Sequence, residues 1–444
     1  MKQTTFEIQK ETKTPRAVLV GLNTGMTDSD FERSMDELKD LVKAIDLEPA
    51  LTVTQALPSP DRSTFIGSGK VEEIASALDV FDIDIVVFND SLSPMQARNL
   101  EKALDTEVID RTGLILQIFA KRAKTREARL QVEYAQLQYM LPRLAHMKTS
   151  LSRQGGGSGR LSNKGSGEKQ LELDRRRIEH RMAELRRELE SVEKERTTQR
   201  GRRVNSGIPK VSLVGYTNAG KSTILNSLLR LYGAEGNEEK QVLEKDMLFA
   251  TLDTSVRNIA PKGERPFLLS DTVGFISQLP HSLVKAFRST IEEVKFADLI
   301  LEVVDFSDPE YRWHMDVTRD TFAEIGIQDI PIVYVFNKSD KVQKEQMEEG
   351  RLVIEIPKTS EDRIYISAKD EVCLKALVDL IEKKISEDHR ECELLLPYSE
   401  SGIMGELKKR GLIQAMEYLP EGIKIAAILD ERDQSRFGDF IEEG

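Results

Sequence analysis

The segment that most restricts the fold is residues 215–222, GYTNAGKS. It fits the pattern GxxxxGK[ST] and lies between an apolar run of strand length, KVSLV, and a helix-like segment, KSTILNSLL. Glycines let a backbone turn tightly enough for successive N–H groups to surround phosphate oxygens. A strand, a phosphate-binding loop (the P-loop) and a helix in this order predict a mostly parallel α/β sheet that carries a nucleotide.

A second motif, DTVG at residues 271–274, is expected to act with the P-loop on the phosphates. Lys221 can neutralise the β and γ phosphates, and the Ser222 hydroxyl can bind Mg²⁺. Asp271 ends an apolar, strand-like run, where a carboxylate can hold the water shell of the Mg²⁺. Gly274 can offer its amide to the γ-phosphate. These residue types predict a Mg²⁺-dependent nucleotide site.

Two later motifs, NKSD at residues 337–340 and SAK at 367–369, indicate that the base is guanine. Asp340 can accept hydrogen bonds from both N1–H and N2–H₂ of guanine, a donor pair that adenine lacks. Asn337 can tie this loop to the P-loop, the stem of Lys338 can cover the base, and an amide of SAK can point at guanine O6. A site of this kind rejects adenine because its own polar groups would be left unpaired. A metabolic phosphotransferase would need a substrate pocket in place of these two motifs, so we rank that alternative last.

Charge is distributed unevenly along the chain. The formal net charge is −12, but residues 120–210 hold 23 Lys/Arg and 11 Asp/Glu, a net charge of +12, so the remainder carries −24. A basic module joined to acidic ones is typical of proteins that contact phosphate backbones.

The basic region has the pattern of two facing helices. Apolar residues step by four and three on both sides of a glycine-rich stretch, SRQGGGSGRLSNKGSGEKQ, at residues 152–170. This spacing predicts an antiparallel helical hairpin with the glycine-rich stretch at its tip. Pro142 should kink or end the first arm, and residues 197–207 (TTQRGRRVNSG) should form a linker. The two seams consist of Leu130, Tyr134, Leu137, Leu141 and Leu144, and of Ile178, Met182, Leu185, Leu189 and Val192.

These patterns together predict an α/β multidomain protein. We expect an N-terminal α/β domain (1–111), a long antiparallel helical hairpin (112–205) with a Gly-rich basic loop (153–169), a P-loop GTPase domain with a mostly parallel sheet (206–387), and a small α+β C-terminal domain (388–444). Residues 66–70, IGSGK, lie in the first domain and open a helix. They could bind an anion, but the motif lacks the rest of any nucleotide fingerprint, so a tight strand-to-helix turn is the preferred interpretation.

Four segments resemble the HflX family of translation-factor-like GTPases: FATLDTSVR (249–257), DTVGFI (271–276), TFIGSGK (64–70) and EKQLELDRR (168–176). The resemblance runs from about residue 16 to past residue 400 and is most specific at the two segments near the phosphates. It implies a GTPase that binds the ribosome. It also implies that Thr251 closes on Mg²⁺ and the γ-phosphate, with Thr254 as the competing candidate.

Two positions bear on the mechanism that the resemblance implies. Phe275 stands where related enzymes carry a water-orienting glutamine, so hydrolysis should be slow alone and stimulated by ribosomes. His281 is a weak in-chain substitute. Asn218 resembles an asparagine that binds a monovalent cation in some related GTPases, so K⁺ is a candidate cofactor beside Mg²⁺.

The complete set of expected site residues follows from the motifs and the resemblance. No catalytic residue is assigned, because Phe275 occupies the glutamine position and Thr251 and Gly274 act as switch residues. The expected Mg²⁺ ligands are Ser222 and Thr251, with Asp271 acting through water. The residues expected to bind GTP are Gly215, Tyr216, Thr217, Asn218, Ala219, Gly220, Lys221, Ser222, Thr223, Phe249, Ala250, Thr251, Leu252, Asp253, Asp271, Thr272, Val273, Gly274, Asn337, Lys338, Ser339, Asp340, Ser367, Ala368 and Lys369.

The expected partners are GTP or GDP and the ribosome, mainly RNA of the large subunit, contacted by Arg153, Arg160, Lys164 and Lys169 of the loop. We expect a monomer in the reduced cytoplasm, where the two cysteines, Cys373 and Cys392, are inert thiols. We expect no membrane span, because no run of eighteen apolar residues occurs. The leading function is rescue, splitting or recycling of stalled ribosomes under stress. The loop lacks the arginine–proline element of the family pattern. This difference suggests an alternative function, that of a resistance-type member of the family that clears drug-stalled ribosomes. The rival from another class is a non-catalytic RNA-binding or ribosome-assembly switch.

Overall fold

The computed structural model describes residues 14–153, 164–204, 207–233, 249, 255–261, 265–272, 274–277, 292–327, 329–387 and 389–442. Internal contacts divide the chain into two compact units, and the division falls within one long helix, between Leu189 and Glu190. The predicted fold class is confirmed, since an N-terminal α/β part, a long helical pair, a mostly parallel sheet with the P-loop and a small C-terminal sheet are all present. The exact domain boundaries stay predictions.

The first unit contains a parallel sheet of four strands in the order β2-β1-β3-β4. Its core is formed by the apolar strands and the inner faces of the helices, with Val18, Val86 and Ile74 fully buried. The elements are β1 (Arg16–Asn23), α1 (Asp28–Lys43), β2 (Glu48–Ala56), α2 (Ser68–Phe81), β3 (Ile85–Phe88), α3 (Pro94–Leu104), β4 (Glu107–Asp110) and α4 (Arg111–Arg122).

The glycine-rich turn of residues 66–70 is held by groups of the protein itself. Gly67 is the N-cap of α2, and its N–H donates to Gln55 Oε1 at 2.9 Å. Lys70 Nζ lies 2.6 Å from Glu73 Oε2 on the same helix. The turn opens a helix as expected, but β2 ends at Ala56, so it does not directly follow a strand.

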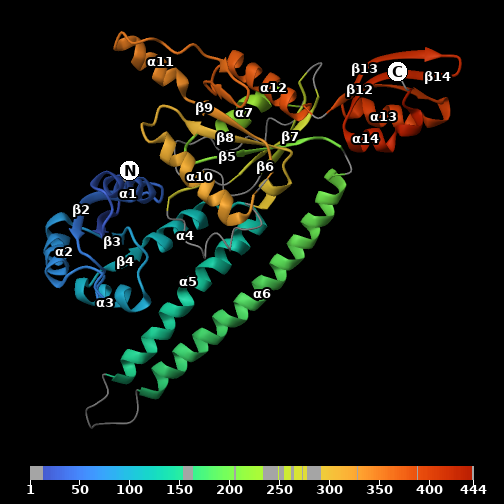
Figure 1. Cartoon of the computed structure of the whole chain (residues 1–444). Helices are drawn as coiled ribbons and strands as arrows, with labels where there is room; N and C mark the ends of the chain where they lie inside the picture. Colours follow the sequence, from blue (N-terminus) through green and yellow to red (C-terminus); the bar gives the residue numbers. More distant parts are fainter. Residues whose placement is uncertain are drawn as a thin grey trace, which may run out of the picture. The chain divides into compact units, whose positions relative to one another are not determined.

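Helix α5 (Arg126–Arg153) and helix α6 (Lys164–Val204) form the long antiparallel pair, drawn in green shades in Figure 1. Arg181 Nε and Nη2 donate to the two carboxylate oxygens of Glu133 at 2.7 and 3.0 Å, and Arg126 Nη2 lies 3.0 Å from Glu188 Oε2. Residues later in α5 therefore pair with residues earlier in α6. This is the antiparallel register that the two predicted seams require. Within the seams, Leu130 and Leu185 are buried.

Two expectations about these helices are wrong in detail, and a third is decided only in part. Helix α5 continues through Pro142, so the first arm does not end there, while the kink stays a prediction. Helix α6 continues to Val204, so residues 197–204 are helical rather than a linker. Helix α6 also begins at Lys164, inside the predicted loop of 153–169. Extending an existing helix costs little per residue, about 1 kcal/mol for a glycine, so a long arm can absorb several weak helix formers.

A smaller correction concerns the start of α1. The sequence Ser29-Asp30-Phe31-Glu32 fits the capping-box pattern and predicts Ser29 as the N-cap, but Ser29 lies inside the helix. The N-cap is Thr27, whose extended backbone lets its side chain accept a hydrogen bond from Asp30 N at 3.2 Å.

The second unit is built on a seven-stranded sheet in the order β10-β11-β9-β8-β5-β7-β6. The pairs β6–β7 and β10–β11 are antiparallel and the others are parallel. Helices α7 and α12 cover one face, where Val211, Leu301 and Leu377 are fully buried. The elements are β5 (Lys210–Val214), α7 (Lys221–Tyr232), β6 (Ser255–Ile259), β7 (Phe267–Asp271), β8 (Leu299–Asp305), α10 (Tyr311–Ile325), β9 (Ile332–Asn337), α11 (Ser339–Glu348), β10 (Lys358–Thr359), β11 (Arg363–Tyr365) and α12 (Glu371–Ile385).

The C-terminal part is a three-stranded antiparallel sheet in the order β12-β14-β13. Its core includes Leu394, Ile425 and Leu429. The elements are β12 (Arg390–Leu396), α13 (Ser401–Lys409), β13 (Ile413–Leu419), β14 (Gly422–Leu429) and α14 (Glu431–Arg436).

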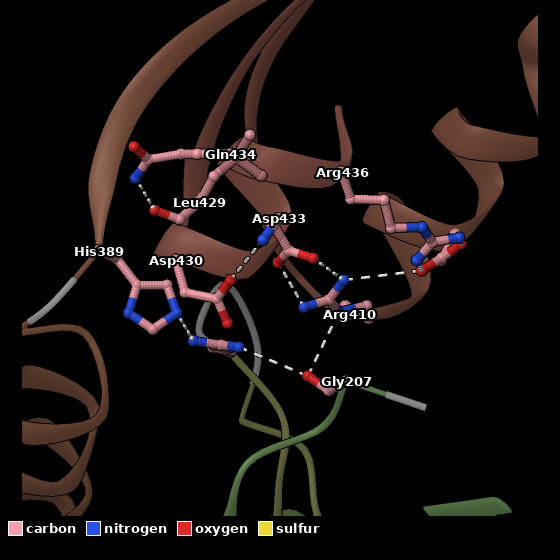
Figure 2. A network of polar contacts seen from close by, with 10 residues as sticks. Gly207, His389, Arg410, Leu429, Asp430, Asp433, Gln434 and Arg436 are labelled. Carbon is pink, nitrogen blue, oxygen red and sulfur yellow. Dashed lines mark hydrogen bonds and ion pairs between the residues drawn. The ribbon is translucent and has the colours of Figure 1, made fainter. Parts of the chain in front are cut away.

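A buried polar network joins the helices of the C-terminal part to Gly207, three residues before β5 (Figure 2). Arg410 donates to both carboxylate oxygens of Asp433 at 2.9 and 2.6 Å, and its Nε lies 3.3 Å from Gly207 O. Gly207 has φ +62°, and a Cβ there would lie 2.1 Å from Arg410 Nε, so this position requires glycine. Arg265 donates from Nη1 to His389 Nε2 at 2.7 Å, which requires that ring nitrogen to be unprotonated.

Candidate nucleotide site

The P-loop follows β5, and two of its glycines have conformations that no other residue would adopt without strain. Gly215 has φ +135°, and a Cβ there would lie 2.2 Å from Val303 O. Gly220 has φ +98°, and its Cβ would lie 2.2 Å from Asn337 Nδ2. The loop is therefore fitted against the ends of β8 and β9, and the spacing of its glycines follows from these two contacts.

Lys221 is buried at the first position of α7. Its Nζ donates to Gly215 O at 3.0 Å and to Tyr216 O at 2.8 Å, so the ammonium group is held inside the loop. Burial lowers the pKa of Lys221 to about 8, against the opposing effect of Asp271. A nearby phosphate would favour the charged form of this lysine.

The two described candidate Mg²⁺ ligands adjoin each other. Ser222 Oγ donates to Asp271 Oδ2 at 2.7 Å, and Asp271 is fully buried at the end of β7. A hydroxyl and a carboxylate are hard oxygen ligands that suit Mg²⁺, which binds through one or two protein groups, substrate phosphates and water. These residues therefore fit the ion that the P-loop fold uses. Thr251 lies outside the described residues.

The guanine motifs meet the P-loop through Asn337. Its Nδ2 donates to Ala219 O at 2.9 Å, and its Oδ1 accepts from Ala368 N at 2.9 Å, so one side chain joins three loops. Lys338 Nζ lies 2.7 Å from Asp305 Oδ2. Asp340 is exposed in the first turn of α11, where its carboxylate is open to a ligand. The contact predicted for Asn337 is present, while the base-binding roles stay predictions.

Phe275 is buried rather than directed at solvent. Its ring is 3% exposed and packs edge to face on Phe322 of α10, with ring centroids 6.0 Å apart. A phenyl ring held in this way has no polar atom with which to orient a water molecule. The described part of the site thus has side chains suited to phosphate and Mg²⁺, but no general base at the position of Phe275.

Other predicted residues fall in or beside segments that the structure does not describe. Phe249 is described and buried, with φ +54°. The expected residues outside the described ranges are Ala250, Thr251, Leu252, Asp253 and Val273 of the nucleotide site and Arg160 of the RNA-contacting loop, together with the alternatives Thr254 and His281.

Sequence reasoning missed an aromatic group at the start of α10. His314 stacks on the Tyr216 ring with centroids 4.0 Å apart and an interplanar angle of 26°, and the Trp313 ring lies 5.8 Å from the same tyrosine. It also missed Asp305, the partner of Lys338. The available signal was the run YRWH, at residues 311–314, shortly after a buried strand. The carboxyl ends of parallel strands lie at the same edge of a sheet, so residues that closely follow a strand lie near the P-loop.

Comparison with known proteins agrees with this site. Residues 32–120 match the family described as GTP-binding GTPase N-terminal, residues 122–203 match its middle region, and residues 210–338 match the family described as 50S ribosome-binding GTPase. A protein named GTPase HflX from Lacrimispora saccharolytica is 42% identical over 93% of this chain and 93% of its own length. Another of that name, from Caldanaerobacter subterraneus, is 39% identical over 96% of this chain and 94% of its own length.

Among solved structures, a GTP-binding protein from Sulfolobus solfataricus in complex with GDP covers 84% of this chain and 99% of its own, at 25% identity and a TM-score of 0.42. Within the described ranges, no helix has the length and apolar character needed to span a membrane.

Proposed function

We propose that this chain, which belongs to the HflX family of GTPases, is a cytoplasmic, ribosome-associated factor. It binds the large subunit and uses GTP hydrolysis to rescue, split or recycle stalled ribosomes under stress. The observation that carries the proposal is the attachment of a long basic helical pair to a GTPase domain in one chain. The description of the family matched by residues 210–338, a 50S ribosome-binding GTPase, supports the same partner.

The helical pair has the properties of a stiff, charged arm. Helix α5 has 28 residues and α6 has 41, so they span on the order of 40 and 60 Å. Ion pairs between the helices, such as Arg181 with Glu133, fix their register. A stiff arm loses little conformational freedom on binding, and its net positive charge suits it to RNA phosphates.

Salt-dependent binding to isolated large subunits tests the partner. Replacement of Arg153, Arg160, Lys164 and Lys169 by alanine should lower the fraction that co-sediments by about tenfold and should flatten its dependence on salt. A matched control replaces four exposed lysines elsewhere, Lys43, Lys102, Lys344 and Lys358, and should sediment like the wild type. Equal loss in both variants, or no loss in the first, would reject the arm as the RNA contact.

The guanine assignment has its own test. Asp340→Asn replaces an acceptor by an amide, so GTP affinity should fall by about a hundredfold, while xanthosine triphosphate should gain affinity. Isothermal titration with both nucleotides measures the exchange. Unchanged GTP affinity would refute the role of Asp340.

We also propose that Asn218 binds K⁺ beside the phosphates. Asn218 is exposed at the tip of the P-loop with φ +62°, so its side chain is open to an ion. Replacement of K⁺ by Na⁺ should then slow GTP hydrolysis in the wild type but not in Asn218→Ala. The comparisons favour neither the resistance-type alternative nor the non-catalytic switch.

A further inference from the structure

The carboxyl end of β8 carries an acidic side chain that is fixed within its own loop. Asp305 is the last residue of β8, and its Oδ1 accepts hydrogen bonds from Ser307 N at 3.1 Å and from Ser307 Oγ at 2.6 Å. The strand end is also tied to β9, because Asp305 is in register with Asn337 and Phe306 N donates to Asn337 O at 2.9 Å. One carboxylate oxygen is thus used within the loop, and the other lies beside the NKSD motif.

Lys338 of the NKSD motif meets that second oxygen. Its Nζ lies 2.7 Å from Asp305 Oδ2, and the two side chains are only 19% and 18% exposed. Water and salt screen a sheltered pair less than a surface pair, so the carboxylate can hold the ammonium group in one position.

The backbone of Lys338 is fixed as well, in a conformation that a lysine seldom adopts. Its φ is +60°, in the left-handed region. The next residue, Ser339, is fully buried, and it donates from N to Ile366 O at 3.1 Å and from Oγ to Phe336 O at 2.8 Å. The loop therefore determines one end of the Lys338 side chain and Asp305 determines the other, which leaves few conformations for the four-carbon stem between them.

We propose that Asp305 positions Lys338 for nucleotide binding, by fixing its stem in the orientation that covers the guanine base. The proposal rests on the guanine assignment made above for the NKSD motif. A free lysine side chain loses rotamer freedom when a base packs on it, whereas a stem already ordered by an ion pair loses less. Asp305 acts on the base only through Lys338, so its contribution to nucleotide affinity should vanish when Lys338 is removed.

A double-mutant cycle measures this dependence by isothermal titration with GDP. Asp305→Asn removes the charge but keeps an oxygen for Ser307, so GDP affinity should fall about fivefold as the stem loses its anchor. Lys338→Ala should lower GDP affinity about twentyfold, and in that background Asp305→Asn should change it by less than twofold. The same loss in both backgrounds would overturn the proposal, because Asp305 would then act through its own loop.

Pyrophosphate distinguishes an effect at the base from a general loss of the site. It offers phosphate groups without a base, so its affinity for Asp305→Asn should stay within about twofold of that for the wild type. A parallel fall in pyrophosphate affinity would contradict a positioning role. The matched control is Asp40→Asn in α1, which removes the acid of another lysine–aspartate pair, with Lys43 Nζ and Asp40 Oδ1 3.0 Å apart. It should bind GDP like the wild type.

Lys338→Met tests the same ion pair from the other side, and does so even if Asp305→Asn fails to fold. It keeps a stem of similar length without the ammonium group, so GDP affinity should also fall about fivefold. Wild-type affinity in Lys338→Met would overturn the proposal. Wild-type affinity in Lys338→Ala would overturn it together with the base-covering role of the lysine. A loss in Lys338→Ala with none in Asp305→Asn would reject Asp305 alone and leave the guanine assignment standing.

Discussion

Two turns of this protein share glycine, lysine and a following helix, yet they differ in everything that a phosphate would meet. In residues 66–70, the amide of Gly67 is already used by Gln55, and Lys70 pairs with Glu73 at the surface. In the P-loop, Lys221 is buried and held by two carbonyl groups of the loop. The comparison teaches that a glycine–lysine pattern indicates a phosphate site only where packing buries the lysine and dictates the glycines.

The four-stranded and seven-stranded sheets each carry a buried acidic side chain, and the two side chains differ in their hydrogen-bond partners. Asp110 ends β4 and accepts hydrogen bonds from Leu92 N, Gly113 N, the Tyr139 hydroxyl and Arg143 Nη2, at 2.7 to 3.0 Å. Glu302 lies on β8, is 4% exposed, and its Oε1 has no hydrogen-bond partner within the part of the chain that the structure describes. We therefore expect Asp110 to stabilise the folded protein and ionised Glu302 to destabilise it.

The lysine contrast predicts the largest effect. Lys221→Ala should weaken GDP binding by about a thousandfold, because it removes a buried cation from two phosphates. Lys70→Ala should leave GDP affinity within about twofold, because Lys70 pairs only with Glu73. Titration with a fluorescent GDP analogue measures both. A comparable loss in Lys70→Ala would show that the first turn also takes part in nucleotide binding.

The difference in GDP affinity between alanine variants of the two glycines should be nearly as large. Gly220→Ala places a methyl group against Asn337 at a positive φ, which costs at least about 3 kcal/mol, or a hundredfold in GDP affinity. Gly69→Ala meets no atom within 4 Å and lies inside α2, so it should stabilise the protein slightly and leave binding unchanged. The same titration with thermal unfolding separates the two. Wild-type affinity in Gly220→Ala would mean that the loop can relax.

The two acids should respond with opposite signs when neutralised. Asp110→Asn leaves Arg143 without its buried partner and should lower the free energy of unfolding by about 3 kcal/mol. Glu302→Gln should instead raise it by up to about 3 kcal/mol at pH 8, because burial raises the pKa of Glu302 to about 7. Denaturant unfolding measures both changes.

The gain from Glu302→Gln should depend on pH in one direction only. Below about pH 4.5, Glu302 is protonated in both the folded and the unfolded chain, so it costs nothing. As pH rises, the unfolded chain releases the proton first, and stability falls until pH passes the folded pKa of about 7. The difference between wild type and Glu302→Gln should therefore be small at pH 4.5 and constant above pH 8. An equal difference at both pH values would contradict a protonation effect.

The smallest expected effect is the pH dependence of GDP binding. Phosphate binding favours the charged form of Lys221, whose pKa in this structure is about 8. Affinity should be level below pH 8 and should fall above it by at most about tenfold per pH unit. Titrations at pH 7, 8 and 9 would show the fall, and a constant affinity over this range would mean that Lys221 stays charged.

The sequence predicted the parts of the site that depend on short motifs at strand ends. The order of four motifs and the alternation of strands and helices were enough for the fold class, the P-loop and the contact of Asn337 with its neighbours. Parallel strands bring such motifs to one edge without further information.

What the sequence could not predict depends on packing between distant segments or on the choice between equal local signals. Tyr216 and His314 meet although nearly a hundred residues separate them. Thr27 and Ser29 are both good N-caps, and only the backbone selects Thr27. Helix α5 passes through Pro142, although a proline inside a helix is locally unfavourable.

GTP turnover with and without large ribosomal subunits tests the central claim most directly. A P-loop with a buried Lys221, and with Phe275 in place of a water-orienting residue, predicts turnover below about 1 s⁻¹ for the protein alone, and at least a tenfold increase with large subunits. Lys221→Ala should abolish turnover in both conditions, and Lys70→Ala should not. Fast turnover by the protein alone, or a rate that large subunits leave unchanged, would contradict the account.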